Sequence, residues 1–421
     1  MIDTETTNAT GLDRRAFLRR SLDLTTGRLL NTGTPPKAAM TAPQSTSKDL
    51  LLYVFMRGAA DGLNIVVPHA EADYYTARST LALAQPGKGK GSVLDLDGFF
   101  GLHPALVPFK RLYDAKLLAP VHACGSPDPT HSHFDGMDYM ERGMPGDKRL
   151  ATGWLGRHLQ LTAGSNDSPL RAVGMGGLLQ TSLRGTNNAV AMSSIAAFHL
   201  GKGSNSQVLE AALRELYGGD GMLNGVAQQT FSVLETIDQR LKPDYQPAQG
   251  ANYPPSPFGR SLQEIAQLAK SDQGMEVACA DIGGWDTHAA QGGAEGHMAM
   301  LLTDLSQGLE AFVTDLQDRT DHLTIAVMSE FGRRVKENAS QGTDHGHGNC
   351  AFVIGGGVQG GKVYSQWPGL HPEQLYGPGD LQVTTDFRDV LAEIVGRRLG
   401  NTHLDQVFPG YTPRALNLIT S

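Results

Sequence analysis

The chain has 421 residues, of which 40% are hydrophobic and 19% are charged, with 51 glycines and a formal net charge of −8. This length suits one large α/β domain or two ordinary ones, and the glycine content indicates many tight turns. The acidic balance, without a dense basic stripe outside the N-terminus, argues against nucleic acid as the main partner, and no run of about 18 apolar residues exists that could span a membrane.

The N-terminal stretch LDRRAFLRRS contains the pair Arg14 and Arg15 ahead of apolar residues. This pattern resembles the twin-arginine export signal, which a translocase reads. We therefore expect a disordered leader over residues 1–47 and a periplasmic or secreted protein. Asp23 and Arg28 interrupt the apolar region that such a signal requires, so a degenerate leader on a cytoplasmic protein is the alternative.

The folded part is predicted to be a single domain over residues 48–421, with an insertion around 182–260. Its first buried strand is Leu50–Met56, which leads into a glycine-containing loop with Arg57 and Asp61. An acidic residue just after the first strand of an open α/β sheet is a common ligand position. The pair Asp-Gly is also ordinary turn chemistry.

A helix over Pro104–Lys116 and a strand over Leu118–Ala123 give a β–α–β pattern. The polar turn after this strand, THSHFD, contains Thr130, Ser132 and His133 and leads into a helix. A hydroxyl at such a turn lies near helix N-terminal amides and can act as a nucleophile. Ser132 followed by Asp135 also resembles a capping box, and the two roles are compatible.

Further along, MEVACADIGGWDTH predicts a strand from Met275 that ends in two glycines, followed by Asp286 and His288. A carboxylate and an imidazole two positions apart in an extended loop point to the same side, as two ligands of one ion require. The alternative is a surface Asp-Thr cap for the helix predicted over His297–Asp318.

The strand Leu323–Met328 is followed by Glu330 and Arg333. The glycine-containing loop TDHGHGN then supplies three candidate functional residues, Asp344, His345 and His347. A strand that starts at Cys350 follows it. Such loops at strand ends are where open α/β sheets place their chemistry, although a polar loop can contain histidines without a function.

The remaining predicted features are structural. The segments with helical periodicity are WLGRHLQL, SQVLEAALRELYGG, the stretch Ser261–Lys270 and a final helix within Val383–Gly400 that Thr385 or Asp386 caps. The segment GGKVYSQWPGL is predicted to be hairpin-like. The three cysteines have no metal-type spacing and lie in apolar runs, which predicts buried thiols.

Five motifs of the chain, in this order, closely resemble the motif set of the DUF1501 family of bacterial proteins. They are RGAADGLN, SPDPTHSHFD, GGWDTH, SEFGR and GTDHGHGN. That family in turn looks like a remote branch of the alkaline phosphatase and sulfatase superfamily. The resemblance implies an alkaline-phosphatase-like three-layer α/β/α sandwich with a mainly parallel central sheet and metal ligands at the carboxyl ends of the strands.

The resemblance also implies roles for individual residues. Thr130 or Ser132 stands near the superfamily's nucleophile, and Phe331 stands where a histidine ligand is usual. The metal ligands that it implies are Asp61, Asp286, His288, Glu330, Asp344 and His345. Because phenylalanine cannot bind a metal, a full two-metal phosphatase site is not expected. No serine or cysteine lies in a CxPxR-type context, so formylglycine maturation is not expected either.

The leading functional hypothesis is a metal-dependent hydrolase of a phosphate, sulfate or related ester. Its substrate would be an anionic ester, either a small molecule or a polymer. Zn²⁺, Mn²⁺ and Ca²⁺ all suit carboxylate and imidazole ligands. Ser132 or Thr130 would attack, Arg57 or Arg333 would clamp the anion, and His133 or His347 would protonate the leaving group. The alternative, which Phe331 favours, is a catalytically inactive superfamily member that acts as an exported binding or assembly factor.

Overall fold

Strand β1 (Leu50–Arg57) lies at the centre of the fold in the computed structural model, which describes residues 49–200, 204–219, 222–241 and 244–420. The leader predicted over 1–47 lies outside these residues. Side chains of a strand point alternately to its two faces. The even-numbered residues from 50 to 56 therefore belong to one hydrophobic cluster, and the odd-numbered residues from 51 to 55 belong to another.

The main sheet has eight strands in the described chain. Their spatial order is β11 (Thr385–Asp386), β5 (Leu118–Gly125), β10 (Asn349–Gly355), β9 (Leu323–Ser329), β1, β8 (Val277–Gly283), β6 (Ala172–Met175) and β7 (Ala189–Met192). The neighbours pair in parallel except for β10, which is antiparallel to both β5 and β9.

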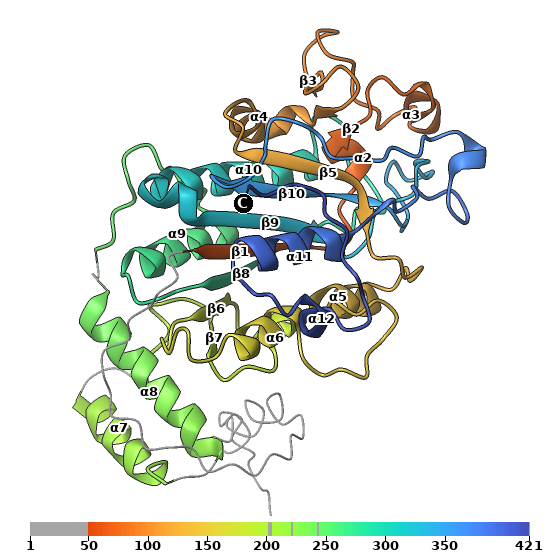
Figure 1. Cartoon of the computed structure of the whole chain (residues 1–421). Coiled ribbons are helices and arrows are strands. Elements are labelled where there is room, and N and C mark those ends of the chain that lie inside the picture. Colours follow the sequence, from red (N-terminus) through yellow and green to blue (C-terminus); the bar gives the residue numbers. More distant parts are fainter. Residues whose placement is uncertain (1–48, 201–203, 220–221, 242–243, 421) are drawn as a thin grey trace, which may run out of the picture. The chain divides into compact units, whose positions relative to one another are not determined.

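Helices cover both faces of this sheet (Figure 1). The cluster on one face includes residues of α4 (Val107–Asp114), α9 (Pro257–Lys270), α10 (His297–Asp315) and α8 (Met222–Arg240). The cluster on the other face includes residues of α5 (His133–Arg142), α6 (Trp154–Leu161), α11 (Phe387–Arg397) and α12 (Leu404–Val407). The predicted α/β/α sandwich with a mainly parallel sheet is therefore confirmed.

The remaining elements lie in the connections between these strands and helices. They are helices α2 (Gly62–Ile65), α3 (Ala72–Ala77) and α7 (Ser204–Leu216), the 3₁₀ helices η1 (Pro104–Leu106), η2 (Thr181–Leu183), η3 (Gln317–His322) and η4 (Pro372–Gln374), and a small sheet of β2 (Val66–Val67), β4 (Gly101–Leu102) and β3 (Leu94–Asp95).

The observed elements differ from the predicted ones in a few places. The hairpin predicted in GGKVYSQWPGL is wrong, because this segment forms only an isolated bridge between Tyr364 and Val121. The last long helix begins at Phe387, and the Asp386 side chain caps it by accepting from the backbone N–H of Arg388. The segment around 182–260 contains α7 and α8, and it also supplies β7 to the main sheet.

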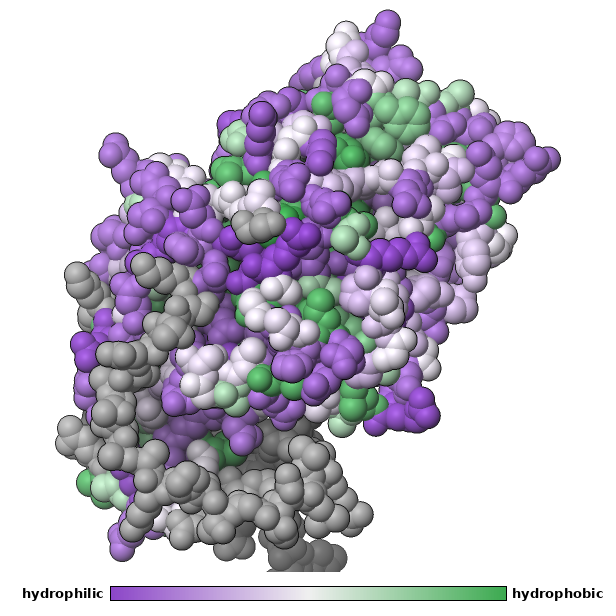
Figure 2. Space-filling view, viewed as in Figure 1, coloured by the Kyte–Doolittle hydropathy of each residue, from purple (hydrophilic) through white to green (hydrophobic). Residues whose placement is uncertain are grey.

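The surface and the cysteines add two findings. Hydrophilic residues predominate on the face in Figure 2, where hydrophobic residues occupy separate small areas. Among the described residues, no helix combines the length and apolar character needed to cross a bilayer. Cys124, Cys279 and Cys350 are buried and form no disulfides, as predicted.

The reversed direction of β10 explains how the polar loops meet. Parallel strands end at one edge of a sheet, and β5, β9, β1 and β8 all end at the same edge. Because β10 runs the opposite way, its first residue, Asn349, pairs with Cys124 near the end of β5. The loop that precedes β10 therefore joins the loops that follow the other strands.

The buried His122 on β5 gives a testable pH dependence. Its Nε2 lies 2.7 Å from the carbonyl oxygen of Val66, and its Nδ1 accepts from the backbone N–H of Ala123 at 2.7 Å. Burial lowers its pKa from 6.5 to about 4. The unfolded chain therefore binds a proton first as the pH falls, so the contribution to stability is complete above pH 6.5 and is lost toward pH 4.

We expect the free energy of unfolding of the wild type to fall between pH 7.5 and pH 5 by about 2 kcal/mol more than that of His122→Gln. Chemical denaturation at a series of pH values measures this difference. His403→Gln, at an exposed position, should keep the wild-type slope. Equal slopes for the wild type and His122→Gln would contradict the assignment.

Candidate metal centre

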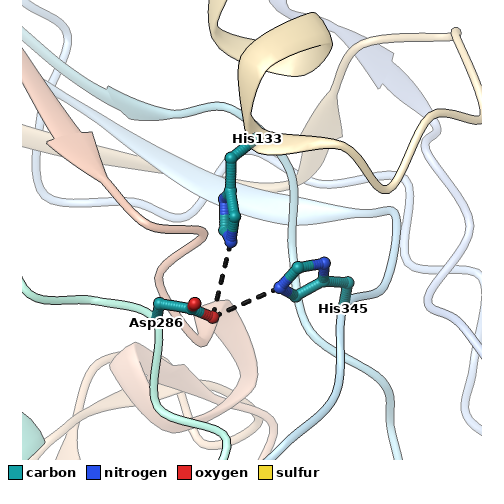
Figure 3. Close-up of side chains that lie close together, drawn as sticks. All are labelled: His133, Asp286 and His345. Atoms are coloured by element: carbon teal, nitrogen blue, oxygen red, sulfur yellow. Dashed lines mark hydrogen bonds and ion pairs between the residues drawn. The ribbon is translucent and has the colours of Figure 1, made fainter.

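Polar side chains from several strand ends meet at the carboxyl edge of the sheet. His133 lies at the start of α5, after β5, and Asp286 and His288 follow β8. His345 comes from the loop before β10. Ligand-type atoms of His133, Asp286 and His345 all lie within 4.8 Å of one another, and their side chains point toward a common centre (Figure 3).

The closest contacts in this cluster converge on one carboxylate oxygen. Oδ1 of Asp286 lies 3.4 Å from Nε2 of His133, 3.2 Å from Nε2 of His345 and 3.1 Å from Nε2 of His288. The Nε2 atoms of His288 and His345 are 2.9 Å apart. Three imidazoles and one carboxylate thus present ligand atoms to the same small space.

The other nitrogen of each ring faces an oxygen that accepts hydrogen bonds. The three pairs are His133 Nδ1 with Glu330 Oε1 at 2.9 Å, His345 Nδ1 with the carbonyl oxygen of His131 at 2.8 Å, and His288 Nδ1 with Asp344 Oδ1 at 3.3 Å. These acceptors place the proton of each neutral ring on Nδ1, so the Nε2 lone pair faces the cluster. Metal-binding histidines in proteins are held in this way.

This arrangement has an electrostatic consequence. Lone pairs of the Nε2 atoms face each other and an acceptor-only carboxylate, and one proton can satisfy only one such contact. The Nε2 atom of His133 is buried and forms no hydrogen bond. A cation bound by all these atoms removes the repulsion and satisfies the unpartnered nitrogen. The residues present therefore fit a divalent metal ion.

The surroundings shift the pKa values within the cluster. Partial burial opposes ionisation of Asp286, but contacts with Arg333 and His345 outweigh it and lower the pKa to about 2. Burial lowers the pKa of His345, whereas the hydrogen bond to Glu330 raises the pKa of His133. At neutral pH these shifts favour a carboxylate at Asp286 and a neutral imidazole at His345, which are the metal-binding forms.

The guanidinium of Arg333 holds Asp286 and the loops around the cluster in place by hydrogen bonds. It is fully buried and donates to the carbonyl oxygens of Gly58, Ala59, Trp285 and Thr343 and to Oδ1 of Asp286, at distances from 2.6 to 3.0 Å. Gly58 has a φ of +120°, and a Cβ there would lie 2.7 Å from the backbone nitrogen of Asp286. This close approach, which glycine permits, lets one arginine join three loops.

Some of the residues expected in the site lie elsewhere or have other partners. Asp61 is buried in an ion pair with Arg78, with N···O distances of 2.5 and 2.9 Å. The structure therefore does not bring it into the cluster. Arg57 pairs with Glu141 at 3.3 Å and with Asp281 at 3.0 Å, and Arg333 has no exposed surface. Neither guanidinium is free to clamp a substrate anion in this arrangement.

Two more expected ligands, Glu330 and Asp344, contact the rear nitrogens of His133 and His288. Their carboxylates orient imidazoles, while His133, expected to be a proton donor, contributes an inward-facing nitrogen. The sequence signal for this role of His133 is its position after β5, in a connection that leaves the same edge of the sheet as the other ligand loops. The sequence marks Glu330 and Asp344 as functional residues but does not show that they contact the Nδ1 atoms of His133 and His288, because these pairs form only through tertiary contacts.

Ser132 is the N-cap of α5, and its Oγ accepts from the backbone N–H of Asp135 at 3.4 Å. Ser132 is therefore confirmed as the cap, although the reciprocal bond of a capping box, from its backbone N–H to the Asp135 side chain, is not formed. Thr130 accepts from the backbone N–H of Ser132 through Oγ1 at 3.2 Å. The ring of the buried His347 stacks on Tyr376 with centroids 4.6 Å apart, and burial lowers its pKa to about 4.

The fold and the cluster define a three-layer α/β protein with a candidate metal centre of histidine and aspartate side chains at the carboxyl edge of its sheet. The family model described as "Protein of unknown function (DUF1501)" matches residues 121–408. The chain belongs to this family, as the motif set predicted. The comparison with curated proteins found no match.

Solved structures similar to the chain include sulfatases and phosphatases. A 2-O GAG sulfatase is 11% identical, with a TM-score of 0.33 and coverage of 88% of this chain and 76% of the other. The alkaline phosphatase of the Antarctic bacterium TAB5 is 10% identical, with a TM-score of 0.29 and coverage of 76% and 95%. The lipoteichoic acid synthase of Listeria monocytogenes is 9% identical, with a TM-score of 0.38 and coverage of 95% and 82%. Such distant likenesses assign no activity to this chain.

Replacing the buried arginine tests its supporting role. Arg333→Lys keeps the charge but supplies three donors without the planar fork, so several of the carbonyl contacts are lost. We expect the free energy of unfolding to fall by about 2–4 kcal/mol in chemical denaturation. Arg149→Lys, whose side chain is 91% exposed, should leave the free energy of unfolding near the wild-type value. Equal stability of the two variants would rule out this role.

Proposed function

We propose that the chain is a metal-dependent hydrolase of a phosphate, sulfate or related ester. The observation that carries this proposal is the convergence of the Nε2 atoms of His133, His288 and His345 on Oδ1 of Asp286. Each of these imidazoles has an acceptor behind it, and the carboxylate is held by a buried arginine. The orientation of these nitrogen atoms toward one carboxylate oxygen supports a metal centre over a structural polar cluster.

The ligand chemistry favours Zn²⁺. Three imidazole nitrogens and one carboxylate oxygen make a common zinc donor set, whereas Ca²⁺ takes six to eight oxygen ligands. His133, His288, His345 and Asp286 would hold the ion. When bound, such an ion polarises an ester oxygen and lowers the pKa of an adjacent hydroxyl or water.

The protein's own groups would position the ester and the nucleophile. Ser132 directly precedes His133 at the N-terminus of α5, so its hydroxyl and that of Thr130 are the candidate nucleophiles. The first turn of a helix offers backbone N–H groups to an anion. The side chains of Asp286 and His288 are 48% and 45% exposed, which supports access by a substrate as large as a polymer.

The alternative is a catalytically inactive binding or assembly factor. It is supported by Phe331, which stacks on His133 with ring centroids 5.2 Å apart and supplies no ligand atom. The pairing of Arg57 with acidic side chains and the burial of Arg333 point the same way, because neither is available to an anion. Bound metal together with turnover would favour the enzyme. Polymer binding that persists after the metal-ligand residues are replaced by alanine would favour the alternative.

The decisive variant is Asp286→Asn, which keeps an acceptor for Arg333 but removes the charge that holds the ion. We expect wild-type protein to carry about one Zn²⁺ per chain and to hydrolyse an aryl phosphate, phosphodiester or aryl sulfate. Asp286→Asn should lose most of the metal and the turnover. Elemental analysis of the purified protein and a screen of these esters measure both.

The matched control is Asp405→Asn, at an exposed position in α12. It should retain the metal content and activity of the wild type. Wild-type protein without metal or turnover, or an Asp286→Asn variant that equals it in both, would refute the proposed function.

A further inference from the structure

The side chain of Gln291 lies in a buried position behind the candidate metal centre. It is fully buried, and its amide makes three side-chain hydrogen bonds. Its Oε1 accepts from the hydroxyl of Thr287 at 2.8 Å and from the hydroxyl of Thr343 at 2.7 Å. Its Nε2 donates to Oδ2 of Asp61 at 2.6 Å. One amide thus joins three segments that are far apart in the chain.

The two threonines lie directly beside the proposed ligands. Thr287 stands between Asp286 and His288, and Thr343 is two positions before His345. The backbone N–H of Thr343 also donates to the carbonyl oxygen of Thr287 at 3.1 Å. Because both hydroxyls donate to one oxygen of Gln291, this amide and the backbone hydrogen bond together hold the two ligand loops side by side.

The position of the amide is itself fixed by the Asp61–Arg78 ion pair. Arg78 binds both carboxylate oxygens of Asp61 and donates to the carbonyl oxygens of Val335, at 2.9 Å, and Arg334, at 3.0 Å. Asp61 and Arg78 have no exposed side-chain surface. A buried network in which each group has a partner holds one arrangement, since any shift leaves a polar group unpaired.

We propose that Gln291 is a positioning residue of the metal centre, which it controls through Thr287 and Thr343. The inference rests on the proposed function, because it presumes that the cluster binds an ion. Gln291 contacts no ligand side chain, so its effect is on the distance between Asp286 and His288 in one loop and His345 in the other. Asp61, expected to be a ligand, acts in this network as the acceptor that orients the amide.

The test uses the full chain with Co²⁺ in place of Zn²⁺, because the visible spectrum of Co²⁺ reports the geometry of its ligands. Gln291→Leu removes all three hydrogen bonds at similar size. We expect a changed Co²⁺ spectrum and a Zn²⁺ affinity about 10- to 100-fold lower than that of the wild type, measured by competition with a chelator.

The control is Gln180→Leu, at a second buried glutamine whose Nε2 donates to the carbonyl oxygen of Met175 at 3.1 Å. It should lower stability in chemical denaturation of the metal-free protein but leave the Co²⁺ spectrum and the Zn²⁺ affinity at wild-type values. This separates positioning from a general effect on folding. Thr343→Val removes a single hydroxyl and is measured in the same way if Gln291→Leu does not fold, with a spectral change expected there too.

The outcomes distinguish this inference from the proposed function. A wild-type spectrum and affinity in Gln291→Leu, or in Thr343→Val where the first variant does not fold, would overturn the inference alone. Wild-type protein that binds neither Co²⁺ nor Zn²⁺ would overturn the proposed metal centre and the inference with it. A changed spectrum in Gln291→Leu together with an unchanged one in Gln180→Leu supports the inference.

Discussion

The antiparallel direction of β10 within an otherwise parallel sheet is the constraint on which the candidate site depends. If β10 ran parallel to β9, the loop before it would lie at the opposite edge, together with His345 and Asp344. Its pairing with β5 and β9 places Asn349 beside the end of β5. Loops that follow three parallel strands and a loop that precedes one antiparallel strand can then contribute to one cluster.

Within that cluster a single oxygen, Oδ1 of Asp286, organises the remaining groups. It accepts a hydrogen bond from the guanidinium of Arg333 at 2.8 Å and lies within 3.4 Å of three imidazole nitrogens. One arginine charge compensates the carboxylate but leaves the nitrogen lone pairs without a partner. The acceptors behind the imidazoles orient each ring so that its Nε2 lone pair faces the carboxylate. The hydrogen bonds that orient the rings therefore also favour the binding of a cation.

The sequence predicts the strands and the polar loops well, because buried strands are short apolar runs and their ends are marked by glycine and acidic residues. The stretch before Glu330 and the stretch before Asp286 are examples, and both end in the cluster. The sequence does not show the direction of β10, because the apolar residues of a buried strand form the same pattern whichever way the strand runs in the sheet. The sequence also does not predict the partners of Asp61, because Arg78 and Gln291 belong to no motif and contact it only through the tertiary fold.

The same contacts bear on how many ions the site can hold. The resemblance to two-metal enzymes pointed to Asp61, Glu330 and the position of Phe331 for further ligands. Asp61 is bound by Arg78 and Gln291, and Glu330 accepts from Gly58, His133 and Ser329. Phe331 is buried and packs against the rings of His133 and His345, each with centroids 5.2 Å away. A second ion would have to break these contacts, whereas one ion at Asp286 requires none of them to change, so the geometry supports a single-ion centre.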